Sequence, residues 1–329
     1  ERFDWLEEIG TDEVIATPGT ESNVKEIYDK CAELRRERGD GIVIFNQFDE
    51  FGNAIWHYHV TGSFVDEVFE RRFAEGRRLS GWVSATGSAG TIAAGDFLRS
   101  RHPGIRVVAT EALQCPTLLS MGFGEHRIEG IGDKHVPWIH NTRNTDMVAA
   151  VDDEQTMQLM RLFNEPEGRA CLLREGVDEA TVENLGLLGI SSLCNLVAAI
   201  KTARYYDMDG RDVIFTPLTD SMDMYATRRQ EMAVRHGDYT ARLAERHTGQ
   251  YLRAISTDHM RELGYADRKA LHQFKYFTWV EQQGRSADEL RELWDPDFWK
   301  AVFSDEVVAE WDRLIGDFNR ATGLAGAGQ

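Results

Sequence analysis

The sequence predicts an α/β protein with three layers: a mostly parallel sheet covered by helices on both faces, followed by an all-helical C-terminal extension. Short apolar runs alternate with helical periodicities up to about residue 216. Strands that are apolar throughout are typical of parallel sheets, which are buried on both faces. Residues 226–320 contain no convincing strand and are rich in Arg, Glu, Trp and Phe.

The elements of the α/β part follow from local signals. Apolar residues recur at helical spacing from Val24 to Leu34. The acidic pair Asp152-Asp153 suits the positive N-terminal end of a helix, and Ser191 is expected to cap another. Strands are predicted at 13–17, 41–45, 81–85, 105–110 and 212–216, and helices at 21–38, 62–75, 91–101, 153–164 and 191–206.

The C-terminal extension shows two helix signals. Ser286 precedes Glu289 at the spacing of a capping box, and apolar residues recur at helical spacing from Val307 to Phe318. Two interpretations stay open: the extension is an oligomerisation or partner-docking surface, or it is a helical layer that covers the sheet of the same chain. The small-residue tail at 321–329 is expected to fray.

Composition narrows the classes of function. The chain has 329 residues and a net charge of −18, which argues against nucleic acids and anionic membranes as partners. No apolar run is long enough to span a bilayer, and the first residues lack the pattern of a signal peptide. The four cysteines have no C-x-x-C spacing and are expected to be thiols in a reducing compartment, so we expect a cytoplasmic protein with no metal site.

The most informative stretch joins the strand at 81–85 to the helix at 91–101. Unpaired N–H groups at a helix N-terminus, together with the helix dipole, favour an anion. The glycines allow close backbone approach, and the hydroxyls add donors. The sequence is neither a P-loop nor G-x-G-x-x-G, and the alternative is an ordinary tight turn. The candidate anion-binding residues are Thr86, Gly87, Ser88, Ala89, Gly90 and Thr91.

Four further segments accompany this loop. They are IVIFNQFDEFGNAIWHYHVTG at 42–62, IEGIGDKHVP at 128–137, GISSLCNLVAAI at 189–200 and VIFTPLTDSMDMY at 213–225. In this order, they resemble motifs of the pyridoxal-phosphate enzymes related to cysteine synthase and cystathionine β-synthase, known as fold type II. The similarity spans roughly residues 1–228 and implies a sheet of the tryptophan synthase β type.

The resemblance implies roles for individual residues. The cofactor phosphate would lie on residues 86–91, and Ser221 would meet the ring nitrogen; the alternative for Ser221 is a helix cap. Gln47, Gly130 and Gly132 would contact the substrate. His57 and His59 lack a third metal ligand at sensible spacing and are expected to be structural.

The sequence departs from the family at the lysine that forms the Schiff base. In the family this lysine lies well before the segment that matches residues 42–62. None of the seven lysines here has that context, and Lys134 only lies near a plausible active-site loop. We therefore expect no catalytic residue in this chain, with the lysine supplied by a second polypeptide or by a missing N-terminal segment.

The resemblance implies a pyridoxal 5'-phosphate enzyme component for β-elimination or β-replacement on a small amino acid: serine, threonine, cysteine or an O-activated serine. The protein would be a lyase or a transferase and an oligomer. The alternative is a degenerate, non-catalytic family member that acts as a regulatory or scaffolding subunit. The expected domains are the remainder of a smaller α/β domain at 1–60, a cofactor-binding domain at 61–228 and the helical extension at 229–329.

Overall fold

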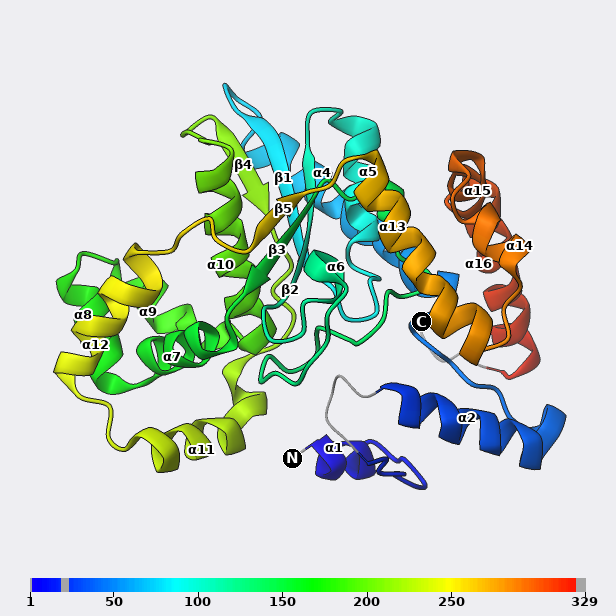
Figure 1. Cartoon of the computed structure of the whole chain (residues 1–329), viewed down its shortest axis with the longest axis horizontal. Coiled ribbons are helices and arrows are strands. Elements are labelled where there is room, and N and C mark those ends of the chain that lie inside the picture. The colour runs from blue at the N-terminus through cyan, green and yellow to red at the C-terminus, as the bar shows by residue number, and fades with distance from the viewer. Residues whose placement is uncertain (1, 19–23, 324–329) are drawn as a thin grey trace.

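A five-stranded sheet forms the centre of the molecule (Figure 1). The computed structural model describes residues 2–18 and 24–323. The strand order is β4-β1-β2-β3-β5. Strands β1 to β4 run parallel to one another, and β5 runs antiparallel to β3. The strands are β1 Arg78–Ala85, β2 Arg106–Ala112, β3 Met147–Val151, β4 Asp212–Phe215 and β5 Met260–Glu262.

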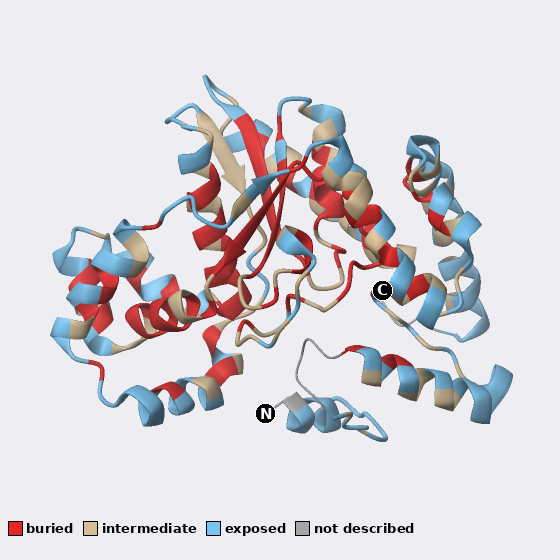
Figure 2. Cartoon of the chain, viewed as in Figure 1, coloured by how far each residue is buried: buried red, intermediate tan, exposed pale blue. Residues whose placement is uncertain are grey.

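Helices cover both faces of the sheet, as predicted. On one face, α10 (Ile190–Tyr205) packs on the strands, with α7 (Asp153–Asn164) against it. On the other face lie α4 (Ser63–Arg72), α5 (Ala93–Arg101) and α13 (Tyr265–Lys275). Successive strand residues point to opposite faces. Accordingly, Val83 and Val108 enter the core beneath α10, and Trp82, Val107 and Val148 enter the opposite core; Figure 2 shows the central strands almost wholly buried.

A third apolar core joins the two ends of the chain. Tyr28 and Phe48 pack with Trp138, Trp279 and Trp299. The C-terminal extension therefore packs on the rest of the chain. The remaining helices are α1 Arg2–Glu8, α2 Val24–Arg38, α3 Phe51–Trp56, α6 Thr117–Ser120, α8 Pro166–Arg174, α9 Glu179–Asn184, α11 Ala226–His236, α12 Ala241–His247, α14 Ala287–Glu292, α15 Pro296–Val302 and α16 Asp305–Ala321.

The three-layer α/β class is confirmed, and four local predictions are wrong. Segments 13–17 and 41–45 form no strand, because no described strand pairs with them; Phe45 is 88% exposed. The C-terminal extension is not all-helical, because β5 adds an antiparallel edge strand. Ser191 is no cap, since the helix begins at Ile190 after Gly189.

Other predicted elements hold with shifted bounds. The helix predicted at 62–75 ends at Arg72, where Phe73 leaves the helical conformation. The capping box between Ser286 and Glu289 is confirmed, with each side chain bonded to the other residue's backbone N–H. Residues 21–23 of the predicted helix at 21–38 and residues 324–329 of the tail lie outside the described residues. Among the described helices, none combines the length and apolarity needed to cross a membrane.

Candidate functional site

A pocket of about 420 Å³ opens where β1 and β4 end at the carboxyl edge of the sheet. Its walls come from four loops, from α2 and α10, and from the helical turn after α3. Loops at the carboxyl ends of parallel strands are the usual ligand-binding position in open α/β sheets. The lining residues are Val24, Ile27, Gln47, Phe48, His57, Ala85, Gly87, Ser88, Ala89, Thr91, Gly130, Ile131, Asp133, Ser191, Asn195, Pro217 and Thr219.

The loop after β1 presents free donors to this pocket. Thr86 is anchored to β2, because its N–H and its hydroxyl both donate to the Thr110 carbonyl at 2.8 and 3.1 Å. Ala89 has a positive φ of 65°, which turns the chain toward α5. The N–H groups of residues 87–91 donate to no described residue. Such unpaired donors near a helix N-terminus suit an anion.

The two glycines of this loop are required by close packing. A Cβ on Gly87 would lie 2.8 Å from the carbonyl oxygen of Gly130, and a Cβ on Gly90 would overlap the side chain of Asn53. Asn53 donates to the Ser88 hydroxyl at 3.0 Å and to the Gln47 carbonyl at 3.0 Å. The loop is therefore held against two other walls of the pocket.

The hydroxyls of the loop differ in availability. The Thr91 hydroxyl pairs with that of Ser84 at 2.7 Å, and the Thr91 carbonyl accepts from the Trp82 indole at 3.2 Å. The Ser88 hydroxyl accepts its bond from Asn53, which leaves its own proton available to a ligand.

Asn195 fixes the relative position of two walls, and the sequence analysis missed it. Its side-chain oxygen accepts from the N–H of Ala85 at 2.8 Å, and its amide donates to the Pro217 carbonyl at 2.9 Å. The side chain therefore joins the end of β1 to the loop after β4. The sequence feature that could have indicated Asn195 is its position at the end of the GISSLCN motif. Its hydrogen-bond partners, however, depend on the strand order, which one sequence does not reveal.

The hydroxyl groups of Ser191 and Thr219 meet in the pocket at 3.1 Å. Thr219 is positioned further by its N–H, which donates to the Ser192 hydroxyl at 3.2 Å. Sequence analysis singled out Ser221 instead. Ser221 lies outside the lining, its hydroxyl 3.3 Å from the Asp223 carboxylate, and it precedes a short 3₁₀ turn without making a capping bond.

The residues predicted to contact the substrate lie in or beside the pocket. Gln47 and Gly130 line it. Gly132 lies behind the wall, where its N–H donates to the Thr86 carbonyl at 3.0 Å. Both glycines have a positive φ, 83° at Gly130 and 75° at Gly132, a conformation that glycine adopts without strain.

The two histidines after α3 have different surroundings. His57 lines the pocket and bonds the Thr61 hydroxyl at 2.9 Å; burial lowers its pKa, which favours the neutral imidazole. His59 bonds the Phe303 carbonyl at 3.1 Å and so joins α3 to the C-terminal helices. The structural role predicted for His59 agrees with this contact, and His57 adds a polar group to the pocket.

No lysine lines the pocket among the residues that the structure describes. Lys201 donates to the carbonyls of Ala150 and Asp258, and Lys275 donates to those of Trp138 and His140 at 2.8 and 2.7 Å. Burial lowers the pKa of Lys275 to about 7, but its side chain is fully buried against these two carbonyls and does not line the pocket. Lys134 lines a separate cavity beside Lys25.

Fold and pocket together define an α/β protein with a loop of unpaired N–H groups at the carboxyl edge of a parallel sheet. No protein-family model matches the sequence. Curated relatives include a cysteine synthase of Staphylococcus aureus, 28% identical over 205 residues, covering 62% of this chain and 58% of the relative. The probable cysteine synthase of Bacillus subtilis is 28% identical over 210 residues, covering 64% and 60%. The chain thus spans about three fifths of the length of these relatives.

Solved structures share the fold. A hydrogen sulfide-producing enzyme of Fusobacterium nucleatum aligns with a TM-score of 0.57 at 20% identity, covering 75% of this chain and 66% of the other. O-acetylserine sulfhydrylase isoform 3 of Entamoeba histolytica aligns with a TM-score of 0.56 at 21% identity, covering the same shares. The resemblance to the fold-type-II pyridoxal-phosphate family, predicted from the motifs, is confirmed by these relatives. The roles of the individual site residues stay predictions.

Proposed function

We propose that this chain forms the cofactor-holding part of a pyridoxal-phosphate enzyme that performs β-replacement or β-elimination on a small amino acid, with an O-activated serine as the preferred class. The loop at residues 86–91 is the observation that carries this proposal, because the N–H groups of residues 87–91 have no acceptor among the described residues. The names of the relatives, cysteine synthase and O-ureido-L-serine synthase, support the substrate class.

The residues present fit the cofactor. A phosphate dianion needs several donors, and residues 86–91 contain only small and hydroxyl-bearing side chains. Asp133 is the one carboxylate among the residues that line the pocket. When bound, the cofactor supplies an electron sink for the bond changes at the amino acid. The chain's own residues would do the rest: the loop orients the phosphate, and Gln47 and Gly130 hold the substrate near it.

For the ring nitrogen, we propose Ser221 as the partner. Its hydroxyl makes no helix-capping bond, and its 3.3 Å contact with Asp223 is long for an O–H donor. A neutral hydroxyl does not force the pyridine nitrogen to be protonated, which suits elimination and replacement better than transamination. Thr219, two residues earlier and already in the pocket, is the alternative partner.

We propose further that the lysine comes from a segment outside these 329 residues. The support is twofold. Every lysine of the chain lies away from the lining, and large apolar side chains near α1 and α2 are exposed, including Trp5 at 56%, Val43 at 75% and Phe45 at 88%. Apolar groups exposed in such numbers indicate a covering partner. The second candidate, a regulatory or scaffolding subunit, is favoured by the same lack of a pocket lysine.

One experiment separates these possibilities. The chain is purified alone, mixed with pyridoxal phosphate, reduced with borohydride and mapped by mass spectrometry. We expect weak cofactor binding, no specifically labelled lysine and no turnover of O-acetylserine. A single labelled lysine together with turnover would contradict the supplied-lysine proposal. Failure to bind the cofactor even beside a co-purified lysine-bearing polypeptide would favour the regulatory subunit.

A further inference from the structure

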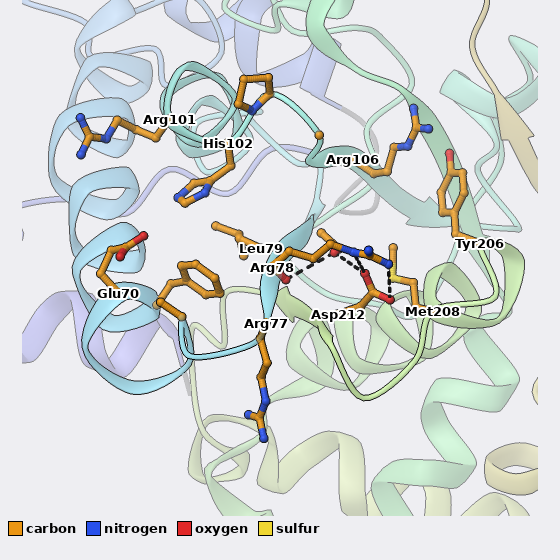
Figure 3. Close-up of a pocket in the computed structure, with 15 residues that line it drawn as sticks. Glu70, Arg77, Arg78, Leu79, Arg101, His102, Arg106, Tyr206, Met208 and Asp212 are labelled. Atoms are coloured by element: carbon orange, nitrogen blue, oxygen red, sulfur yellow. Dashed lines mark hydrogen bonds and ion pairs between the residues drawn. The ribbon is translucent and has the colours of Figure 1, made fainter.

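A second, larger cavity lies at the opposite edge of the sheet, where the strands begin. It measures about 700 Å³, and the first residues of β1, β2 and β4 line it: Arg78, Arg106 and Asp212 (Figure 3). The Arg78 guanidinium and the Asp212 carboxylate form an ion pair at 2.6 Å. This end of the sheet is remote from the carboxyl edge, so the cavity is separate from the cofactor pocket.

Three side chains of types that can ligate metals, Asp66, Glu70 and His102, lie together beside this cavity, and Glu70 and His102 line it. Asp66 and Glu70 are four residues apart on α4, a spacing that places them on one helix face. His102 follows the last residue of α5. One ligand atom from each residue lies within 4.8 Å of the other two, and the His102 Nε2 is 2.6 Å from Asp66 Oδ1. Figure 3 shows the Glu70 carboxylate and the His102 ring turned toward one another.

The positions of these ligands are partly fixed in advance. The backbone N–H of His102 donates to the Leu98 carbonyl at 2.7 Å. The His102 ring packs edge-on against the Phe69 ring, with the ring centroids 5.3 Å apart. Glu70 makes no ion pair with any residue in the described ranges and borders the open cavity. The cavity thus offers a path for an ion and room for a water ligand.

From these three residues, we propose a site for a divalent transition metal, with Zn²⁺ as the best fit. An imidazole nitrogen and two carboxylate oxygens suit this ion, with water in the fourth position. Tetrahedral ligands at Zn²⁺ lie about 3.3 Å from one another. Here the His102 Nε2 and the Asp66 Oδ1 are 2.6 Å apart, and the three ligand atoms all lie within 4.8 Å of one another.

The charges around the three side chains are mixed. Two carboxylates lie beside the imidazole, and Arg101 contacts one of them, with its Nε 3.3 Å from Asp66 Oδ2. Arg77, Arg78 and Arg106 also line the cavity, and Arg78 is paired with Asp212. The Arg101 side chain is 63% exposed, so it can move into solvent when a metal takes its place. The bound ion would tie α4 to the end of α5 and so brace the helical layer on this face of the sheet.

The test uses the whole chain, free of any affinity tag and treated with a chelator. Zn²⁺ is titrated by calorimetry into the wild type, Glu70→Gln and the control Glu67→Gln, which makes the same charge change one turn earlier on α4 at an exposed residue. We expect one ion per chain, unchanged affinity in Glu67→Gln and affinity at least about tenfold weaker in Glu70→Gln.

Because Glu70 is exposed, its substitution leaves the fold intact. Visible absorption of the Co²⁺-substituted protein gives a second reading, since tetrahedral coordination strengthens its bands. We expect those bands in the wild type and in Glu67→Gln and their loss in His102→Asn. Absence of Zn²⁺ binding, or equal affinity in Glu70→Gln and Glu67→Gln, would overturn the proposal.

Discussion

Gly87 matters because of the side chain that it lacks. The backbone of Gly130 approaches so closely that even a methyl group would have to displace it. Sequence analysis could identify the glycine-rich turn, since a strand, small residues and a helix start are local signals. The partner on the opposite wall, 43 positions along the chain, could not be read from the sequence.

Gly87→Asp tests the anion-binding loop. The new carboxylate would stand where the phosphate dianion is proposed to lie, and like charges in a partly buried site repel strongly. We expect the affinity of the assembled enzyme for pyridoxal phosphate, measured by quenching of tryptophan fluorescence, to fall at least about 100-fold, or about 2.7 kcal/mol. Gly210→Asp is the control, because a Cβ there meets nothing within 4 Å. Equal affinity in both variants would exclude the loop.

The substitution Ser221→Asp distinguishes two roles for Ser221, partner of the cofactor's ring nitrogen or helix cap, because the two roles predict opposite results. If its hydroxyl meets the ring nitrogen, Ser221→Asp favours a protonated pyridine and shifts the cofactor's visible absorption, whereas Ser221→Ala loses about 0.5–1.5 kcal/mol of binding. A helix cap would tolerate Asp, since Asp caps as well as Ser. We expect the shift. An unchanged spectrum in Ser221→Asp, with weakened binding in Thr219→Val, would assign the ring nitrogen to Thr219.

At the scale of elements, the sequence predicts what local periodicity decides. β1, α5, β2, α7 and α10 were found within a few residues of their observed bounds because each is long and apolar on the face it buries. The failures depend on partners distant in sequence. β5 has three residues and exists only because it pairs with β3, and segments 13–17 and 41–45 have the composition of strands but no described neighbour to pair with.

The residues of the candidate site also fall into two groups, those that local sequence motifs indicate and those that depend on distant parts of the chain. The pocket is lined by Gly87, Ser88, Ala89, Thr91, Gln47 and Gly130, which the sequence singled out because each belongs to a motif that a linear pattern can show; their roles stay predictions. Asn195 and Thr219 were missed, because their importance arises from the adjacency of β1 and β4, strands separated by more than 120 residues. A side chain that joins two strand ends has no signature of its own in one sequence.

At the scale of the whole molecule, buried histidines make the stability of the fold depend on pH. Burial lowers the pKa of His135, His140 and His272 to about 3, so all three are neutral in the folded chain near neutral pH. In the unfolded chain each binds a proton below about pH 6.5. Their stabilising contribution is therefore complete above pH 6.5 and is lost as the pH falls from 6.5 toward 3.

The substitution His135→Gln measures how much His135 contributes to the loss of stability at low pH. His135 bonds the Tyr28 hydroxyl at 3.1 Å and so ties α2 to the loop at 126–137. Below pH 6.5, each such histidine lowers the free energy of unfolding by up to about 1.4 kcal/mol per pH unit, and glutamine cannot. We expect urea unfolding between pH 6.5 and 4.5 to show a pH slope shallower by about that amount in His135→Gln, and no change in the partly exposed control His236→Gln. Equal slopes in His135→Gln and the wild type would mean that His135 takes up its proton in the folded chain as readily as in the unfolded chain, which would contradict the prediction.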